Sequence, residues 1–203
     1  MTETSGKAAT KRRLEPQFRR VAIVDAAAEL FFEMGYAQTK LEHISARIGF
    51  RKPVIYESFS GKQDVLAGVA AAGIEGGLAI LGGKGDAGAG AAELVDLLVE
   101  VAEFFIRHHR HILVYLREEK NLAPEDAERI RARRRDFDLV LMSYLERASA
   151  AGQIRIGDPR LTAYTLGGLI TWPVFWFNPE RTFSEEDIVA QVRADLLRLL
   201  GLD

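Results

Sequence analysis

The chain contains no cysteine among its 203 residues. A disulfide framework, a thiolate zinc site and a cysteine nucleophile are therefore excluded. The first twenty residues are polar and basic and lack the apolar segment of a secretory signal. No apolar run is expected to reach the ~18 residues that a transmembrane helix needs, and no strand-like alternation follows residue 66. These absences predict an all-helical, cytoplasmic protein without a membrane partner.

The charge of the chain is small but unevenly distributed. Hydrophobic residues make up 48% and charged residues 28% of the sequence, which is typical of a globular protein. Residues 1–64 hold 11 lysines and arginines against 8 acidic residues, a net charge of +3. Because the whole chain carries −2, the remainder carries −5. This asymmetry favours a nucleic-acid partner for the N-terminal part.

A basic segment opens the chain, with Lys7, Lys11, Arg12, Arg13, Arg19 and Arg20 against Glu15. Such an arm can lie along phosphates or enter a minor groove. Residues 1–16 could equally be a disordered, solubilising tail. Arg19 and Arg20 stand at the start of the first expected helix, where we predict phosphate contacts.

Residues 39–66 have the pattern of two short helices around a glycine turn. Thr39 and Glu42 have the spacing of a capping box at the start of the first helix. An apolar-to-small stripe follows at helical spacing and consists of Leu41, Ile44, Ser45 and Ile48. Gly49 is placed where that helix must end, because glycine adopts a positive φ without steric cost.

The second helix of the pair begins near Pro53, whose missing N–H costs nothing in a first turn. Ile55 and Phe59, four residues apart, are expected to anchor it to the core. The opposite face is mostly polar and consists of Arg51, Lys52, Val54, Tyr56 and Glu57. This is the pattern of a helix-turn-helix, which places its second helix in the DNA major groove.

The flanking segments complete a small domain. Residues 21–34 have helical spacing and stop at Gly35. Lys62 lies in the first turn of a further helix, where a cation opposes the helix dipole. A phosphate beside it would reverse that effect, so Lys62 is a candidate DNA contact.

Together these residues resemble the tetracycline-repressor-like (TetR) family of transcriptional regulators. The matching positions are Phe31, Gly35-Tyr36, Thr39, Ile44-Ser45, Gly49-Phe50, Tyr56-Glu57-Ser58-Phe59 and Lys62-Gln63-Asp64-Val65-Leu66. The resemblance covers residues 17–66 and implies a three-helix DNA-binding head. It also implies a larger helical domain over 67–203 for ligand binding and dimerisation, with about nine helices in all. The implied DNA-contacting residues are Arg19, Arg20, Thr39, Lys40, Arg51, Lys52, Val54, Tyr56, Glu57 and Lys62.

Three departures from the family pattern lie in this head. Arg51 stands where the family usually has a capping serine, Pro53 replaces a glycine or alanine, and Ser58 replaces a histidine or tyrosine. These changes leave the expected fold intact and make the operator sequence unpredictable.

Beyond the head we expect helices over 90–109, 110–120, 124–151, 159–177 and 184–200. Their boundaries are marked by Pro124, Gly152, Asp158-Pro159, Asn178-Pro179 and a Ser184/Asp187 capping box. Residues 82–90 form a glycine-rich linker. They contain the letters G-x-G-x-x-G, but no strand precedes them, so a dinucleotide site is not predicted.

Large side chains are concentrated in the middle helices and suggest an effector pocket. The candidates are Phe104, Phe105, Tyr115, Arg117, Phe137, Met142, Tyr144, Trp172, Phe175 and Trp176. For any single aromatic residue, an ordinary core position is the alternative. A kink at Trp172-Pro173 would leave space beside it. The arginines of 129–135 are either a solvated, salt-bridged face or an anion clamp.

The last two helices suggest assembly into a homodimer. Ile188, Val192, Leu196 and Leu199 repeat at helical spacing, and Gly167 and Gly168 would allow close backbone approach. The same apolar stripe could instead pack within its own chain. A dimer would set two heads about 34–36 Å apart, the spacing of successive major grooves.

These patterns predict a regulator that binds a double-stranded DNA operator and a small hydrophobic effector, without enzymatic activity or cofactor. His108, His109 and His111 lack the further ligands that zinc would need. A helical adaptor without DNA binding is the alternative, although it leaves the basic head unexplained. Residues 115–118, 131–135 and 172–179 loosely resemble the branch of the family that responds to acyl-CoA thioesters.

Overall fold

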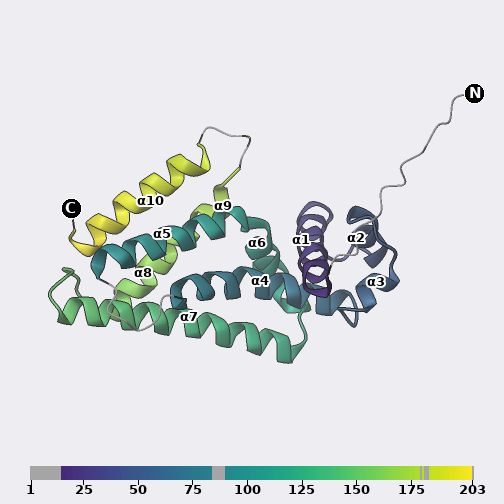
Figure 1. Cartoon of the computed structure of the whole chain (residues 1–203), viewed down its shortest axis with the longest axis horizontal. Helices are drawn as coiled ribbons and strands as arrows, with labels where there is room; N and C mark the ends of the chain where they lie inside the picture. Colours follow the sequence, from purple (N-terminus) through teal and green to yellow (C-terminus); the bar gives the residue numbers. More distant parts are fainter. Residues whose placement is uncertain (1–14, 84–89, 179, 181–182, 203) are drawn as a thin grey trace, which may run out of the picture.

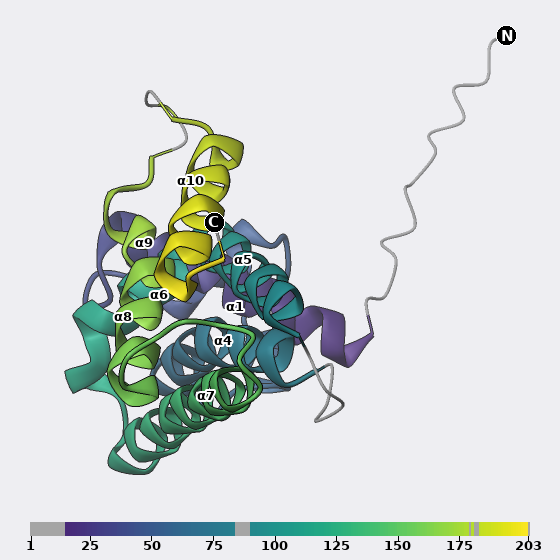
Figure 2. The ribbon, with the colours of Figure 1, turned by 90° about the vertical axis from the view of Figure 1, so that its left-hand side faces the viewer.

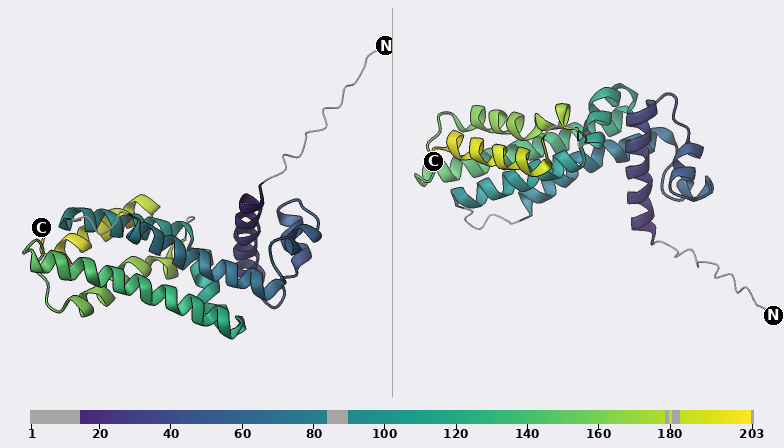
Figure 3. Two further views of the ribbon diagram at one scale, coloured as in Figure 1. Left: turned by 60° about the horizontal axis from the view of Figure 1, so that its bottom comes forward. Right: turned by 90° about the horizontal axis from the view of Figure 1, so that it is seen from above.

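Figure 1 shows the fold, a computed structural model that describes residues 15–83, 90–178, 180 and 183–202. The expected basic arm and most of the glycine-rich linker therefore lie outside the described residues. Every regular element of the described part is helical, as predicted. A small head of three helices stands at one end of an elongated helical body, and α4 runs from the head into the body (Figures 1 and 3).

The head consists of α1 (Pro16–Met34), α2 (Leu41–Arg47), α3 (Pro53–Tyr56) and the first turns of α4 (Lys62–Gly82). Most of the apolar positions predicted from helical spacing in and next to α2 and α3 are buried there, and Ile48 is half-buried. Ile44 and Ile55 are fully buried, and Phe59 is 2% exposed. α1 ends at Gly35, which has a φ of 83°, as the glycine stop predicted.

The body consists of α5 (Ala91–Arg107), α6 (His109–Glu118), the 3-10 turn η1 (Glu119–Asn121), α7 (Pro124–Ala150), α8 (Pro159–Thr171), α9 (Pro173–Trp176) and α10 (Glu185–Leu200). Two predicted starts are confirmed by their caps. Asp158 accepts a hydrogen bond from the Leu161 N–H at 2.9 Å, and Ser184 accepts one from the Asp187 N–H at 3.1 Å. The helix expected over 159–177 is broken at Trp172-Pro173 into α8 and α9, because proline cannot continue the hydrogen-bond ladder.

The two parts of the chain share their apolar interior. Val114 and Tyr115 from α6, and Leu122 and Ile130 from the α7 region, belong to the same buried cluster as the head residues. α4 also continues as one helix across the boundary predicted at residues 66 and 67. The head is therefore seated on α4 and α6 through a continuous apolar contact.

The length and composition of α4 differ from the expectation that no segment is apolar enough to span a membrane. It is long and apolar enough to cross a membrane by length and composition alone, although no such run was expected. Half of its most apolar window is buried against the other helices. Figure 2 shows α4 enclosed between α5, α6 and α7, so it is the central helix of the core.

Candidate nucleic-acid interface and internal cavity

The turn between α2 and α3 has the geometry that the glycine predicted. Gly49 has a φ of 69°, in the left-handed region that glycine adopts at no steric cost. The Phe50 N–H donates to the Ser45 carbonyl at 2.9 Å, and the Gly49 N–H donates to the Ala46 carbonyl at 3.1 Å. These two bonds close the end of α2 and redirect the chain into α3.

The face of α3 that points away from the core carries the predicted polar set. Arg51, Tyr56 and Glu57 are exposed, whereas Lys52 and Val54 are half-buried. Figure 3 shows α2 and α3 on the outer side of the head, away from the body. The arrangement leaves a short, accessible helix with a polar surface, which is the geometry a groove-binding helix requires.

Lys52 is held in place by α2. Its ammonium group donates to Glu42 at 2.6 Å and lies 5.8 Å from the centre of the Tyr56 ring. The hydrogen bond from Lys52 lowers the pKa of Glu42, and the same bond raises the pKa of Lys52. The pair therefore stays ionised at neutral pH and links α2 to α3.

Lys62 points toward the protein. Its ammonium group donates to the carbonyls of Tyr36, Ala37 and Thr39 at 2.9, 3.3 and 3.0 Å, and it lies 4.3 Å from the centre of the Tyr36 ring. These carbonyls satisfy all three ammonium donors. They also offset the unfavourable helix dipole, a role that the sequence interpretation assigned to a DNA phosphate.

Arg19 and Arg20 connect α1 to the segment that follows α3. Arg19 forms an ion pair with Glu57. Arg20 donates to the Ser58 carbonyl at 2.7 Å, and its guanidinium lies 4.1 Å from the centre of the Phe59 ring. In this arrangement both arginines bind other parts of the head.

The prediction for Thr39 is wrong. Thr39 is fully buried, and its hydroxyl donates to the carbonyls of Gly35 and Leu30 at 2.8 and 3.2 Å. It therefore neither lies at the surface nor forms the predicted capping box with Glu42. The N-cap of α2 is Lys40, whose N–H donates to the His43 ring at 3.3 Å.

Two of the predicted DNA-contacting cations differ from the rest. Lys40 and Arg51 are exposed, and neither forms an ion pair with another residue in the described part of the chain. They stand at the starts of α2 and α3, on the outer side of the head. Both charges are therefore available to an external anion.

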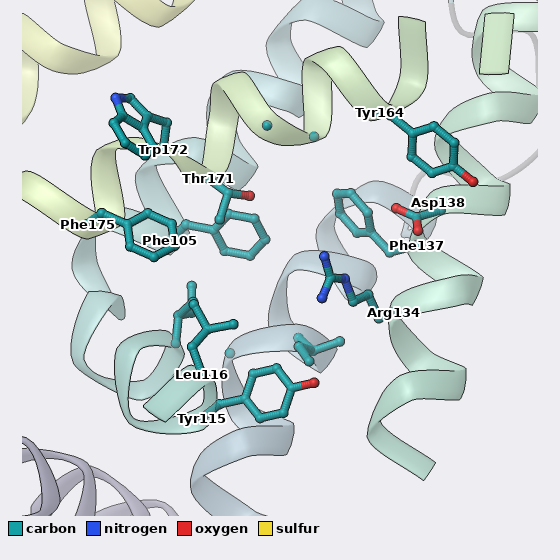
Figure 4. Close-up of a pocket in the computed structure, with 15 residues that line it drawn as sticks. Phe105, Tyr115, Leu116, Arg134, Phe137, Asp138, Tyr164, Thr171, Trp172 and Phe175 are labelled. Carbon is teal, nitrogen blue, oxygen red and sulfur yellow. The ribbon is translucent and has the colours of Figure 1, made fainter. Parts of the chain in front are cut away.

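The body contains a cavity of about 430 Å³ between α4 and the helices α5 to α9. Its walls are mostly apolar and aromatic, with Arg134, Asp138, Thr171 and two tyrosines as polar members (Figure 4). The lining residues are Gly73, Ile74, Phe105, Ile112, Tyr115, Leu116, Arg134, Phe137, Asp138, Tyr164, Gly167, Gly168, Thr171, Trp172 and Phe175. This size and lining suit a small organic molecule.

Half of the predicted pocket residues line this cavity, namely Phe105, Tyr115, Phe137, Trp172 and Phe175. The other five lie elsewhere. The Phe104 ring stacks on the His108 ring with their centres 4.0 Å apart, and the Arg117 guanidinium lies 5.2 Å from the centre of the Phe32 ring. Tyr144 is buried in the core of the body. Met142 lines a second hollow, and Trp176 lines an outer groove.

Several lining residues were missed by the sequence interpretation. Tyr164, Gly167 and Thr171 lie at steps of three and four on one face of α8, a spacing that the sequence does contain. Gly167 and Gly168 were predicted to bring a second subunit close. Both border the cavity, and a Cβ atom at either would meet nothing within 4 Å of its own chain; their contact with a second subunit stays a prediction.

The predicted dimer seam on α10 is mostly wrong. Ile188, Val192 and Leu196 are 5%, 3% and 0% exposed, and they belong to the core of their own chain. Only Leu199, at 44%, is exposed. The apolar spacing identified the buried face of α10 correctly, but that face packs against α5 and α8 of the same chain.

The three neighbouring histidines pack at the junction of α5, α6 and α1. The His111 ring is buried and lies 3.1 Å from the Asp25 carboxylate, and burial lowers the pKa of His109. Within the described ranges, no three residues of the types that bind metals are grouped to hold an ion.

An exposed helix-turn-helix on a helical body with a cavity of ligand size defines a DNA-binding transcriptional regulator. Residues 23–69 match the family model for bacterial regulatory proteins of the tetR family, and residues 87–200 match the model for the tetracyclin repressor-like C-terminal domain. The chain belongs to the TetR family. No curated protein matches it significantly in sequence.

Solved structures agree with this assignment. A transcriptional regulator of the TetR/AcrR family from Thermobifida fusca is 32% identical, with 89% of this chain and 97% of that chain covered and a TM-score of 0.68. The TetR-family regulator PfmR from Thermus thermophilus is 24% identical, with 87% of this chain and 97% of that chain covered and a TM-score of 0.74. AibR, solved in complex with isovaleryl coenzyme A and operator DNA, is 24% identical, with 90% of this chain and 98% of that chain covered and a TM-score of 0.68.

Proposed function

We propose that this protein is a cytoplasmic repressor that is released from a palindromic operator by a hydrophobic small molecule. The single observation that supports this is the course of α4. Its first residue, Lys62, bonds the loop between α1 and α2, and Gly73 and Ile74, three turns later, line the cavity. A ligand that displaces α4 would therefore move the head, because one rigid helix contacts both.

Within this proposal, the outer side of α2 and α3 contacts DNA. Lys40 and Arg51 bind phosphates, and the short face of Lys52, Val54, Tyr56 and Glu57 enters the major groove. The inward contacts of Arg19, Arg20 and Lys62 support a positioning role for these residues, since their charged groups already bind within the head.

The proposed homodimer uses the outer faces of α8, α9 and α10. Large apolar side chains are exposed there, namely Leu161, Trp172, Trp176, Phe183 and Leu199. Trp172, Trp176 and Phe183 also line an outer groove between α9 and α10. Exposed apolar surface of this kind marks protein interfaces, and pairing would provide the two heads that a palindrome needs.

The effector is proposed to be hydrophobic because aromatic and aliphatic side chains dominate the cavity walls. An acyl-CoA or another intermediate of lipid breakdown is one candidate, in line with the isovaleryl coenzyme A bound by AibR. The ligand must bind the two head arrangements with different affinity. A coupling of about 1–3 kcal/mol between the sites is the usual range.

A salt titration of binding to random duplex DNA tests the proposed function. We expect the logarithm of the affinity to fall by about 0.9 per log unit of salt for each phosphate contact. A helical adaptor would show no such slope, and that outcome would reject DNA binding. A thermal-shift screen with fatty acids, acyl-CoAs, steroids and aromatic compounds then identifies effectors, because a ligand that binds only the native state raises the Tm.

A further inference from the structure

Arg134 differs from the other arginines of α7. Five arginines fall within residues 129–135. Four have ion-pair partners: Arg129 with Asp126, Arg131 with Glu119 and Glu128, Arg133 with Asp136, and Arg135 with Glu128. Arg134 has no such pair among the described residues, and it is the one member of this run that lines the cavity. Its charge is therefore available to a molecule in the cavity.

Arg134 lies beside aromatic side chains on the cavity side and is exposed to solvent on the other. Figure 4 shows its guanidinium extending from α7 into the space between Tyr115, Phe105 and Phe137. Burial raises the pKa of Tyr115, and the nearby charge and hydrogen bond of Arg134 act in the opposite direction. Tyr115 is therefore a neutral hydroxyl at physiological pH, and a ligand bound here meets one full positive charge.

Asp138, one helical turn further along α7, is the acidic group of this cavity. Its carboxylate lies on the Tyr164 side in Figure 4. Burial raises the pKa of Asp138, although the charge of Arg134 partly opposes this. An ionised Asp138 would repel an anionic ligand, so it weakens the attraction of Arg134 without removing it.

We propose that Arg134 anchors the charged head of the effector, and that the effector is an amphipathic molecule with one carboxylate and an apolar body. This inference rests on the proposed function of the cavity. Arg134 is exposed to solvent, so the head group stays near water while the body lies against Phe105 and Phe137. The planar guanidinium can bind a carboxylate through two parallel hydrogen bonds.

An anionic head could also belong to a coenzyme A thioester. Coenzyme A carries several phosphates, whereas the remaining arginines of this run are neutralised by their own carboxylates. The cavity of about 430 Å³ is also at the lower end of the roughly 300–1,000 Å³ of typical ligand sites. Both observations favour a free carboxylate.

Calorimetric titration of the full chain, in the absence of DNA, tests the anchor. The ligands are octanoate and 4-phenylbutyrate, their alcohols 1-octanol and 4-phenyl-1-butanol, and octanoyl-CoA. We expect at least one carboxylate to bind about 10- to 100-fold more tightly than its alcohol, the gain that a hydrogen bond to a charged group brings. Arg134→Gln should abolish this advantage and leave the affinity for the alcohol unchanged.

Two further variants serve as controls. Arg133→Gln removes the neighbouring, ion-paired arginine and should change neither affinity. Asp138→Asn removes the repulsion and should tighten carboxylate binding without affecting the alcohol. Unchanged Tm values for the unliganded variants establish that the fold is intact.

The proposal is overturned if neither carboxylate binds, if Arg134→Gln weakens acid and alcohol equally, or if octanoyl-CoA binds more tightly than octanoate and independently of Arg134. Each result is separate from a failure of the proposed function. That function fails if random DNA gives no salt slope, or if a bound ligand leaves the affinity for DNA unchanged.

Discussion

The head and the body both use cations to link their helices, but the groups that these cations contact differ. In the head, Lys62 and Arg20 donate to backbone carbonyls and hold short helices together. In the body, Arg107 and Arg193 link α5 and α10 through the carboxylates of Glu185 and Asp96, and Arg134 lines the cavity of about 430 Å³. Bonds to backbone carbonyls fix the short segments of the head at defined positions, whereas the longer helices of the body leave a space between them with a charge beside it.

Truncation of a buried aromatic side chain should give the largest difference in stability loss between the head and the body. Phe59→Ala in the head should lower the free energy of unfolding by about 3–5 kcal/mol, because Phe59 is packed on all sides. Phe137→Ala should cost less, since one side of its ring already borders the cavity and makes fewer contacts. Urea unfolding followed by circular dichroism measures both. Equal losses would contradict the difference in packing.

Lys62→Met tests whether this cation holds the head together. Removing its three hydrogen bonds should lower the stability by about 1–3 kcal/mol, and the salt slope of DNA binding should stay unchanged. Lys40→Met is the matched control, because Lys40 is exposed and forms no ion pair within the described residues. It should leave the Tm unchanged and reduce the slope. The reverse pattern would assign the phosphate contact to Lys62.

Arg51→Gln tests the outer side of the head. The slope of log affinity against log salt should fall by about 0.9 per subunit, the value for one phosphate contact, with no change in Tm. Arg47→Gln is the comparison, because Arg47 bonds Glu29 and Glu33 on α1 at 2.6 and 3.1 Å. It should retain the full slope. An unchanged slope for Arg51→Gln would remove this residue from the interface.

The smallest expected effect concerns the start of α10. Ser184 and Asp187 cap each other there, and the hydrogen bonds from Ser184 lower the pKa of Asp187. This stabilisation is complete above the unfolded pKa of about 3.9 and is lost as the pH falls through the lower folded value. Ser184→Ala should lower the Tm by about 2–4 °C at neutral pH. The difference should shrink at pH 2, where only the bond from the Asp187 N–H to Ser184 remains to be lost; a difference of the same size at pH 2 would exclude the ionised carboxylate as a contributor.

Local signals explain most of what was predicted correctly from the sequence. Pro124, Asp158 and Ser184 mark helix starts because capping and the missing proline N–H act within one turn. Gly49 marks a turn because only its own φ matters. Thr39 was misassigned because its hydroxyl contacts the carbonyls of Leu30 in α1 and of Gly35 directly after it. The spacing of a capping box gives no sign of these contacts with the preceding helix.

Assignments that depended on a partner element were less accurate. The stripe on α10 was predicted to face a second subunit, but helical spacing cannot distinguish a second subunit from α5 of the same chain, against which three of its four residues are buried. The same limit applied to the aromatic residues of the body. Five of them meet at the cavity only because the helices α5 to α9 bring distant segments together.

The sequence by itself determined the order of the helices, their ends and the helix-turn-helix, because these depend on interactions within a few residues. The tertiary structure alone decided which charges bind inward, which arginine of α7 faces a cavity, and which apolar faces stay exposed. Those outcomes depend on the relative orientation of helices far apart in the chain, and that orientation is set by the packing of the whole core.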